Sequence, residues 1–320
     1  MVALLKAAVV GVGNMGRHHA RIYSELPDVE LVAICDLNKE RGNEYSKKFN
    51  CNYYEDYHDL LNNKQIDLVS IAVPTVHHKK IALDFLNKGI HVLVEKPICN
   101  TIADARELIA AAKKNNVLLL VGHVERYNPA VIKLKEMIEE GIFGDLISIN
   151  AKRVGGYPSQ IRDSDVIIDV AIHDIDLFNF LYGSTPDAVF SNKGIAFGGG
   201  KADYVDILMN YGGKTGFIQC NWITPVKIRT LTITGTKAYA ELNYITQELK
   251  LFETQVIKAV DDFGDFIIKF GNPNVMNITV EKEEPLKLEL LNFISAIQKG
   301  ERLKISPEEA LKALEVVLKI

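Results

Sequence analysis

The sequence predicts an α/β fold: a doubly wound parallel sheet, followed by an α/β domain with a large open, mainly antiparallel sheet. The length of 320 residues corresponds to about two domains at roughly 150 residues each. Short apolar runs alternate with helical patterns up to Gly122, as in successive β-α-β units. The alternation then stops, so we expect a first domain over residues 1–122 and a second over residues 123–320.

Five strands and four helices are predicted in the first domain. The strands are nearly continuous runs of Val, Ile, Leu and Ala, which is typical of parallel strands covered on both faces. The expected strands span residues 5–10, 30–35, 67–73, 90–94 and 117–121. The expected helices span residues 15–25, 38–49, 76–88 and 101–114, and Gly89 suits the position just after a helix.

The second domain combines a few helices with many closely spaced strands, so we expect an antiparallel sheet. Turns are indicated by Gly212-Gly213 and by the run Gly198-Gly199-Gly200. Ser306, Pro307 and Glu309 match a capping box at a helix start. The expected strands span residues 146–154, 202–211, 215–222, 227–234, 238–243 and 248–252, and the expected helices 129–140, 165–182, 284–299 and 307–319.

Composition and charge exclude several classes of protein. With 37 Lys and Arg against 41 Asp and Glu, the net charge of −4 is too small for a nucleic-acid or membrane-surface binder that works by bulk charge. No apolar run reaches the ~18 residues that a membrane span needs, and the N-terminal apolar run favours a buried first strand over a signal peptide. The four cysteines show no Cys-x-x-Cys spacing, so we expect reduced thiols in a cytoplasmic protein without a structural metal: Cys35, Cys51, Cys99 and Cys220.

A glycine-rich turn, Gly11-Val12-Gly13-Asn14-Met15-Gly16, follows the first strand and opens a helix. Asp36 lies 20 residues after Gly16, at the end of the second strand. Such a turn brings backbone amides and a helix N-terminus to a pyrophosphate, and an acidic residue at this distance accepts hydrogen bonds from a ribose. This pattern predicts NAD as the cofactor; Lys39 and Arg41 weaken the preference over NADP, and a turn that serves only packing is the alternative. The expected contacts are Gly11, Gly13, Asn14, Met15, Gly16 and Asp36.

Two further segments lie at predicted strand ends, where doubly wound sheets bind ligands. Val73-Pro74-Thr75 follows the third strand, and His78 lies just beyond it. Glu95-Lys96-Pro97 ends the fourth strand, which places Lys96 near the nicotinamide end of a cofactor. We expect both segments and His78 to contact the cofactor; a surface Glu–Lys pair and a helix-capping histidine are the alternatives.

The predicted helix 165–182 carries a polar stripe on an otherwise apolar sequence. Asp169, His173, Asp176 and Phe180 follow one another at spacings of four, three and four, so they share a helix face. A carboxylate one turn from an imidazole suits a general acid or base near neutral pH. A surface ion pair is one alternative, and a metal site that includes Asp174 is another, although further ligands are missing.

Polar residues near the predicted domain boundary are candidates for binding a substrate. Arg126, Tyr127 and Asn128 open the second domain, and further cations follow it along the chain. Arginine forks match the oxygens of a diphosphate. The candidates in this group are Arg126, Tyr127, Asn128, Arg153, Tyr157 and Arg162.

Taken together, the glycine turn, Asp36, Val73-Pro74-Thr75, Glu95-Lys96-Pro97 and Asp169-x-x-x-His173 resemble the Gfo/Idh/MocA oxidoreductase family. The resemblance runs through most of the chain. It implies a Rossmann domain followed by an α/β domain whose open sheet face forms a homodimer or homotetramer contact. It also implies oxidation or reduction of one secondary hydroxyl of a sugar, nucleotide sugar or cyclitol.

Two short segments are similar to UDP-N-acetylglucosamine 3-dehydrogenases within that family: residues 122–129 and 169–176. The substrate-level expectation is therefore the 3-hydroxyl of a UDP-N-acetylhexosamine. The alternatives are an inositol or free-sugar dehydrogenase, an NAD-dependent glycoside hydrolase and a non-enzymatic NAD-binding regulator. Lys96, Asp169 and His173 are all present, which argues against the regulator.

The resemblance assigns catalysis to Lys96, Asp169 and His173. His173 would remove the hydroxyl proton, Lys96 would donate a hydrogen bond to the developing alkoxide, and Asp169 would orient His173. The sequence leaves open whether Lys96 and His173 exchange these roles.

Overall fold

The computed structural model describes residues 4–62, 65–157, 164–197, 200–253, 256–260 and 266–320, and it confirms the predicted fold class. Contacts within the chain divide it into two compact units. Unit 1 comprises Met1–Tyr127 and Glu284–Glu315, and unit 2 comprises Asn128–Glu283 and Val316–Ile320.

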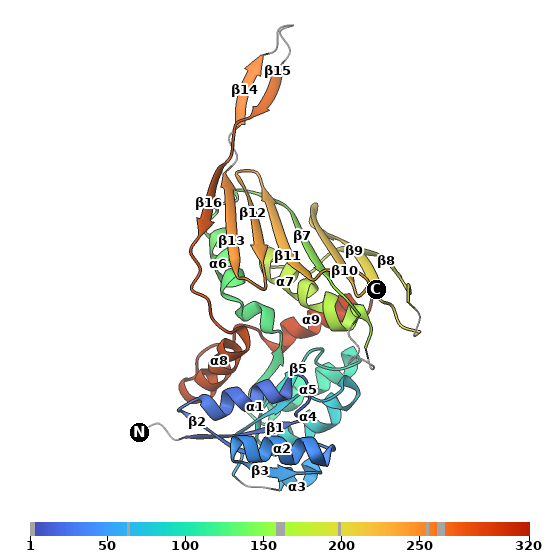
Figure 1. Ribbon diagram of the computed structural model, residues 1–320, viewed down its shortest axis with the longest axis vertical. Helices are drawn as coiled ribbons and strands as arrows, with labels where there is room; N and C mark the ends of the chain where they lie inside the picture. Colours follow the sequence, from blue (N-terminus) through green and yellow to red (C-terminus); the bar gives the residue numbers. More distant parts are fainter. Residues whose placement is uncertain (1–3, 63–64, 158–163, 198–199, 254–255, 261–265) are drawn as a thin grey trace. The chain divides into compact units, whose positions relative to one another are not determined.

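Unit 1 is built on a six-stranded sheet in the order β3-β2-β1-β4-β5-β6, with every neighbouring pair parallel (Figure 1). The five predicted strands are confirmed; β3 lies outside the prediction because three residues make too short a run to stand out. The order reverses between β1 and β4, and ligands of doubly wound sheets bind at such a switch point. The strands are β1 (Leu5–Val10), β2 (Val29–Cys35), β3 (Asn52–Tyr54), β4 (Leu68–Ile71), β5 (His91–Glu95) and β6 (Leu119–Gly122).

Helices of unit 1 follow the strands as predicted. Right-handed crossovers that leave β1 and β4 in opposite directions place their helices on opposite faces of the sheet. Gly89 has a φ of 76°, which ends the preceding helix as expected. The helices are α1 (Gly16–Glu25), α2 (Lys39–Phe49), α3 (Tyr57–Leu61), η1 (Thr75–His77), α4 (His78–Asn87), α5 (Ile102–Lys114) and η2 (Val124–Tyr127).

Two helices near the C-terminus return to unit 1, whereas the sequence assigns them to the second domain. Most of α8 (Pro285–Lys299) and α9 (Pro307–Val317) lies in the segment Glu284–Glu315. The reason is tertiary packing, because one apolar face of α8 joins the hydrophobic core of the parallel sheet: Leu286, Leu290, Phe293 and Ile294. The boundary also falls at Tyr127/Asn128, five residues after the predicted one.

The predicted capping box at the start of α9 is present. The backbone N–H of Ser306 donates to Oε2 of Glu309 at 2.9 Å, and the backbone N–H of Glu309 donates to Oγ of Ser306 at 3.2 Å. Two donors at the helix start are thereby satisfied by side chains.

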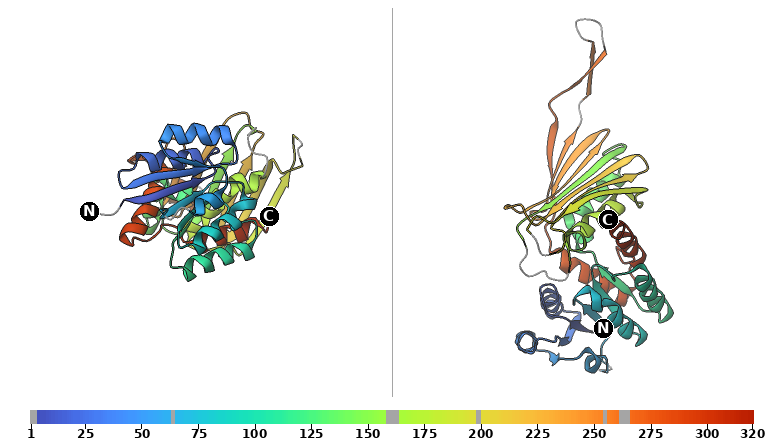
Figure 2. Two further views of the ribbon diagram at one scale, coloured as in Figure 1. Left: turned by 90° about the horizontal axis from the view of Figure 1, so that it is seen from below. Right: turned by 90° about the vertical axis from the view of Figure 1, so that its right-hand side faces the viewer.

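Unit 2 contains an eight-stranded sheet in the order β16-β13-β12-β11-β7-β10-β9-β8 (Figure 2). Every neighbouring pair is antiparallel except β7 and β10, which confirms a mainly antiparallel sheet. A separate hairpin joins β14 (Val256–Val260) and β15 (Phe266–Phe270). The eight strands are β7 (Leu146–Val154), β8 (Ala188–Gly194), β9 (Tyr204–Tyr211), β10 (Lys214–Asn221), β11 (Ile228–Gly235), β12 (Ala238–Asn243), β13 (Glu248–Glu253) and β16 (Asn274–Ile278).

The turn between β9 and β10 follows the sequence prediction. Gly212 and Gly213 have φ values of 63° and 87°, a conformation that two-residue hairpin loops require and that glycine adopts without strain. Gly198 and Gly199 lie outside the described residues.

Helices α6 (Pro129–Glu139) and α7 (Ile172–Tyr182) pack against the sheet of unit 2 (Figure 1). A π-helical segment, η3 (Ile167–Ala171), precedes α7. The apolar residues of the predicted helix 165–182 include six that are buried: Ile167, Val170, Ala171, Leu177, Phe178 and Leu181. None of the helices in the described segments is long and apolar enough to cross a membrane. The four cysteines are free thiols.

Candidate functional site

The glycine turn lies between β1 and α1, at the switch point of the parallel sheet. Gly11 has a φ of 84°, and a Cβ there would lie 2.5 Å from the carbonyl oxygen of Ala72. A Cβ on Gly16 would overlap the carbonyl oxygen of Gly11. Both positions therefore need glycine for the turn itself.

Gly13 differs from the two glycines beside it, because a Cβ at this position would meet no atom within 4 Å. Packing inside the protein therefore does not explain a glycine at Gly13. Asn14 and Met15, which follow it, are exposed. An open approach to backbone at the N-terminus of α1 fits a pyrophosphate, and the turn as a whole fits a dinucleotide.

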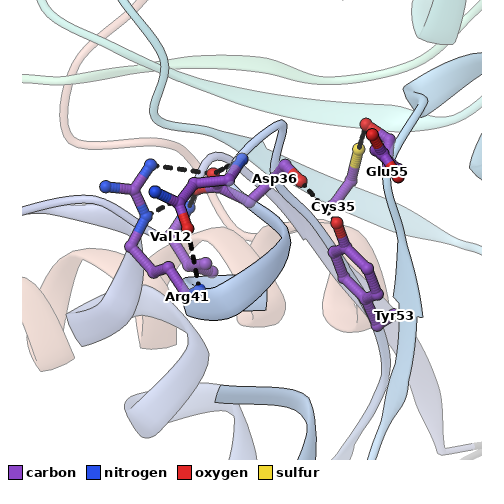
Figure 3. Close-up of polar contacts among 7 residues, drawn as sticks. Val12, Cys35, Asp36, Arg41, Tyr53 and Glu55 are labelled. Atoms are coloured by element: carbon purple, nitrogen blue, oxygen red, sulfur yellow. Dashed lines mark hydrogen bonds and ion pairs between the residues drawn. The ribbon is translucent and has the colours of Figure 1, made fainter. Parts of the chain in front are cut away.

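Asp36 lies at the end of β2 and is only 5% exposed (Figure 3). Its Oδ2 accepts from the backbone N–H of Val12 at 2.9 Å, so it ties the glycine turn to β2. Its Oδ1 accepts from the backbone N–H of Asn38 at 2.8 Å. Asp36 thus lies where the sequence predicts a ribose partner.

Arg41 also binds Asp36, through both carboxylate oxygens (Figure 3). Its Nε lies 3.1 Å from Oδ2 and its Nη2 lies 2.8 Å from Oδ1. With the two backbone donors, this fork uses the roughly four lone-pair sites of a carboxylate. Arg41 is close enough to affect cofactor choice, as the sequence indicates.

His78 joins the two other predicted cofactor segments. Its Nδ1 lies 2.9 Å from the carbonyl oxygen of Pro97, and its Nε2 lies 2.8 Å from that of Val73. The side chain is buried, and burial lowers its pKa below the ordinary value although these hydrogen bonds oppose the shift. Pro74 and Thr75 continue the same segment at the start of η1.

Lys96 follows the last residue of β5 and is half-buried, and its peptide bond to Pro97 is cis. Its backbone N–H lies 3.3 Å from Oε2 of Glu95. Glu95 is buried, and its Oε1 lies 3.0 Å from Nε2 of His19. Because the carboxyl ends of parallel strands share one edge, Lys96 lies on the same edge of the sheet as the glycine turn and Asp36.

Asp169 and His173 lie in unit 2, on η3 and α7. Both are half-buried, and so is Phe180, whereas Asp176 is 1% exposed. The predicted polar stripe is therefore partly present, with Asp176 on the buried side. In the segments that the structure describes, no group of three His, Cys, Asp or Glu side chains is placed to hold a metal ion.

Two of the three arginines predicted to bind substrate are buried and paired with carboxylates. Arg126 is 2% exposed, and its Nη1 lies 2.8 Å from Oε1 of Glu309 within unit 1. Arg153 is 4% exposed, and its Nε lies 2.7 Å from Oδ2 of Asp174 within unit 2. Arg162 lies outside the described residues.

Three other predicted substrate residues have different environments. Tyr127 is buried, and its hydroxyl donates to Asn292 at 3.0 Å. Asn128 is buried and caps α6 by accepting from the backbone N–H of Ala130. Tyr157 is 49% exposed, with its ring edge-on to Trp222.

The structure thus groups the predicted residues by unit. The glycine turn, Asp36, Val73-Pro74-Thr75, His78 and Lys96 belong to unit 1, and Asp169 and His173 belong to unit 2. His19 is not among the predicted site residues, and the structure buries it fully beside Glu95. A polar Ser70 within the apolar strand β4, which contacts His19, is the signal that could have pointed to this cluster.

Comparison with known proteins identifies the family of the chain. A family model described as an oxidoreductase family with an NAD-binding Rossmann fold matches residues 5–123. The model of the Gfo/Idh/MocA C-terminal domain matches residues 131–241. The chain belongs to the Gfo/Idh/MocA oxidoreductase family, its cofactor is NAD, and it is a dehydrogenase that acts on CH–OH groups.

Relatives indicate which branch of the family the chain is similar to. It is 28% identical to the UDP-N-acetylglucosamine 3-dehydrogenase of Acidithiobacillus ferrooxidans over 92% of this chain and 88% of that protein. The crystal structure of that enzyme superposes with a TM-score of 0.87 at 25% identity, covering 100% of this chain and 97% of the other. The myo-inositol 2-dehydrogenase of Thermotoga maritima is 29% identical over 67% of this chain and 68% of that protein.

Proposed function

We propose that this protein is a UDP-N-acetylhexosamine 3-dehydrogenase that transfers a hydride between NAD and the 3-hydroxyl of the sugar. The observation that carries the proposal is similarity across both units to the Acidithiobacillus ferrooxidans enzyme, over 92% of the chain. The similarity to an inositol 2-dehydrogenase of Salmonella typhimurium, at 31% identity, covers 55% of the chain. The longer match to the nucleotide-sugar enzyme supports a nucleotide sugar over an inositol as the substrate.

The cofactor site of the proposal lies in unit 1. The glycine turn would hold the pyrophosphate with backbone N–H groups of Gly13, Asn14 and Met15, and Asp36 would accept from the ribose. Val73-Pro74-Thr75 and Lys96 lie at later strand ends on the same edge. NAD, when bound, supplies the group that accepts or returns the hydride.

The catalytic residues of the proposal come from both units. In the oxidation direction, His173 takes the proton of the 3-hydroxyl while the hydride leaves the same carbon. Lys96 donates a hydrogen bond to the oxygen as negative charge develops on it, and Asp169 orients the imidazole of His173. Each group of this kind contributes about 10²–10⁴-fold to the rate.

The exposure of each candidate residue decides whether we assign it to contacting the substrate. Tyr157, which is half-exposed, is the candidate for contacting the sugar or the uracil. Arg126 and Arg153 are paired with buried or half-buried carboxylates, so we assign them to supporting the backbone around the site instead of to the diphosphate. Tyr127 and Asn128 have the same supporting role.

The open face of the eight-stranded sheet supports a homodimer or homotetramer. Phe190 pairs with Leu208, and Leu208 pairs with Phe217, in a cross-strand row. Their exposures in the single chain are 64%, 45% and 36%. Apolar side chains that lie together on a solvent-facing sheet mark an interface. The free thiols fit a cytoplasmic location.

A substrate panel tests the proposed function. NADH formation would be followed with UDP-N-acetylglucosamine, UDP-N-acetylgalactosamine, free hexoses and inositols. We expect turnover of a UDP-N-acetylhexosamine and a 3-keto product. Preference for an inositol would contradict the substrate, and release of a free sugar without net NADH would indicate a glycoside hydrolase.

Variants of the catalytic residues test the mechanism. Lys96→Ala and His173→Ala should each lower kcat at least ~10²-fold while the Kd for NAD stays within about 3-fold. Full turnover in both variants would contradict the assignment.

A further inference from the structure

A chain of buried polar side chains ends at Glu95, the residue that precedes Lys96. Nε2 of His19 lies 3.0 Å from Oε1 of Glu95, and Nδ1 lies 3.1 Å from Oγ of Ser70. The hydroxyl of Tyr23 lies 2.8 Å from the same Ser70 oxygen. His19, Ser70 and Tyr23 are fully buried, and Glu95 is 8% exposed. The proposed reaction uses none of His19, Ser70 and Tyr23 directly.

The carboxylate at the end of the chain fixes the direction of the first hydrogen bond. Burial raises the pKa of Glu95, but the hydrogen bond and charge interactions with His19 and the charge of Lys96 bring this pKa below its ordinary value. An ionised carboxylate only accepts, so Nε2–H of His19 donates to it. The hydroxyl of Ser70 lies between Nδ1 of His19 and the hydroxyl of Tyr23, and a hydroxyl can donate to one neighbour and accept from the other, so both ring nitrogens of His19 have a partner.

The carboxylate of Glu95 is enclosed tightly as well as hydrogen-bonded. Its Oε2 accepts from the backbone N–H of Lys96 at 3.3 Å. Gly122 pairs with Glu95 across β5 and β6, and a Cβ on Gly122 would lie 3.0 Å from Oε2. The carboxylate therefore has little room to move, and the backbone of Lys96 is fixed to it.

A second buried histidine holds the other side of Lys96. His78 is 1% exposed, and its two ring nitrogens lie 2.9 Å and 2.8 Å from the carbonyl oxygens of Pro97 and Val73. A neutral imidazole has one N–H, so it donates to one of these carbonyls at a time. The segment Glu95-Lys96-Pro97 is thus held by His19 at its first residue and by His78 at its last.

Both histidines come from helices that begin next to cofactor segments. His19 lies in the first turn of α1, which starts at Gly16 of the glycine turn. His78 is the first residue of α4 and bonds to Val73 of the Val73-Pro74-Thr75 segment. A shift in either cofactor segment would therefore reach the backbone of Lys96 through one imidazole.

We infer that His19 and His78 are positioning residues that hold the backbone of Lys96 in register with the two cofactor-binding segments. The role of Lys96 in contacting the reacting oxygen rests on the proposed function. Both histidines are buried and their ring nitrogens face protein atoms, so the inference gives His78 a supporting role in place of the cofactor contact that the sequence predicts. They act on Lys96 through Glu95 and Pro97. Misplacement of a catalytic group by ~1 Å costs about 10²-fold in rate, so the loss of one support has a measurable effect on kcat.

Steady-state kinetics with matched variants test this inference. His19→Leu removes both hydrogen bonds at similar volume, and His19→Gln restores a donor toward Glu95. His78→Leu is the corresponding change on the other side. His91→Leu is the control, because His91 is a half-buried histidine at the opposite end of β5, where its Nδ1 accepts from the backbone N–H of Leu118.

We expect His19→Leu and His78→Leu to lower kcat about 10–100-fold, with the KM for the sugar and the Kd for NAD within about 3-fold of the wild type. His19→Gln should recover most of the loss, and His91→Leu should keep kcat within about 3-fold. A folded His19→Leu protein with wild-type kcat would overturn the inference. If His19→Leu does not fold, His19→Asn decides, because its amide reaches Ser70 but not Glu95, and an unchanged kcat overturns the inference equally.

Hydrogen exchange separates failure of this inference from failure of the proposed function. If the wild type oxidises no sugar in the panel, the proposed function fails, and backbone exchange of residues 95–99 with and without NAD decides the inference. NAD should slow this exchange in the wild type and in His91→Leu, and should leave it unchanged in His19→Leu. Equal protection by NAD in all three proteins would overturn the inference.

Discussion

Replacing Gly13 with alanine separates the cofactor site from the fold. Gly13 and Gly16 lie three residues apart in one turn, yet an added Cβ meets opposite surroundings at the two positions. At Gly13 it would find no atom within 4 Å, and at Gly16 it would overlap the carbonyl oxygen of Gly11. The φ of Gly13 is also outside the left-handed region.

The expected magnitudes follow from this difference. With no clash and no unfavourable φ, Gly13→Ala should leave the free energy of unfolding unchanged or raise it by about 0.4–1 kcal/mol, because alanine restricts the unfolded chain. A methyl group at this position keeps the pyrophosphate from the backbone amides. Two lost hydrogen bonds to a charged group, at about 1.5–3 kcal/mol each, correspond to at least ~10²-fold in the Kd for NAD.

Thermal unfolding and NAD titration of the two variants make the measurement. Gly13→Ala should keep the Tm of the apoprotein and lose NAD affinity, whereas Gly16→Ala should lower the Tm or fail to fold. Wild-type NAD affinity in Gly13→Ala would refute the placement of the pyrophosphate at this turn. A large fall in its Tm would refute the argument from open space.

Three further predictions follow from the described contacts. Arg41→Gln should raise the Kd for NADP about 10-fold and leave the Kd for NAD unchanged or up to about 3-fold lower, measured by titration with both dinucleotides. Burial lowers the pKa values of His78 and His91 from their ordinary 6.5, although hydrogen bonds or a nearby charge oppose the shift. The folded protein then binds fewer protons than the unfolded chain, so the free energy of unfolding is highest above pH 6.5 and falls as the pH drops below that value. Urea unfolding at several pH values would measure this fall. An unchanged urea midpoint would contradict the burial argument. Arg126→Leu should lower the free energy of unfolding by about 2 kcal/mol and leave the KM for the sugar unchanged, because Arg126 is buried and its partner Glu309 is partly exposed. A large rise in KM at unchanged stability would instead show that Arg126 binds the substrate.

Local sequence patterns predict most of the parallel sheet, because buried strands and helix ends are encoded in short stretches of sequence. The glycine at position 89, the Gly212-Gly213 hairpin and the Ser306–Glu309 capping box all depend on neighbours within a few residues. Strand β3 and helix α3 are too short to give such a pattern. The membership of α8 in unit 1 depends on which sheet its apolar face meets, and sequence periodicity contains no information on that.

The site shows the same division between local and tertiary information. The glycine turn and Asp36 are predictable because strand, turn and acidic residue have a fixed spacing along the chain. His18 and His19 are adjacent and alike in sequence, yet His18 is only half-buried and His19 is fully buried beside Glu95. Arg153 has the residue type of a surface cation, and only the fold reveals its pairing with Asp174.

The surroundings of Asp36 indicate what must change when a ribose binds. Two of its four hydrogen-bond donors, the backbone N–H groups of Val12 and Asn38, are fixed by the turn and by the start of α2. The other two belong to Arg41, whose side chain is 43% exposed on a flexible stem. Ribose hydroxyls can therefore replace only the Arg41 fork, and the lost ion pair is worth little because solvent screens it. The displaced guanidinium remains near the 2′-position, where it favours a phosphate, while the carboxylate of Asp36 repels one. The preference for NAD over NADP therefore depends on the balance between repulsion of a 2′-phosphate by Asp36 and its attraction by Arg41. For this reason Arg41→Gln should change the Kd for NADP more than the Kd for NAD.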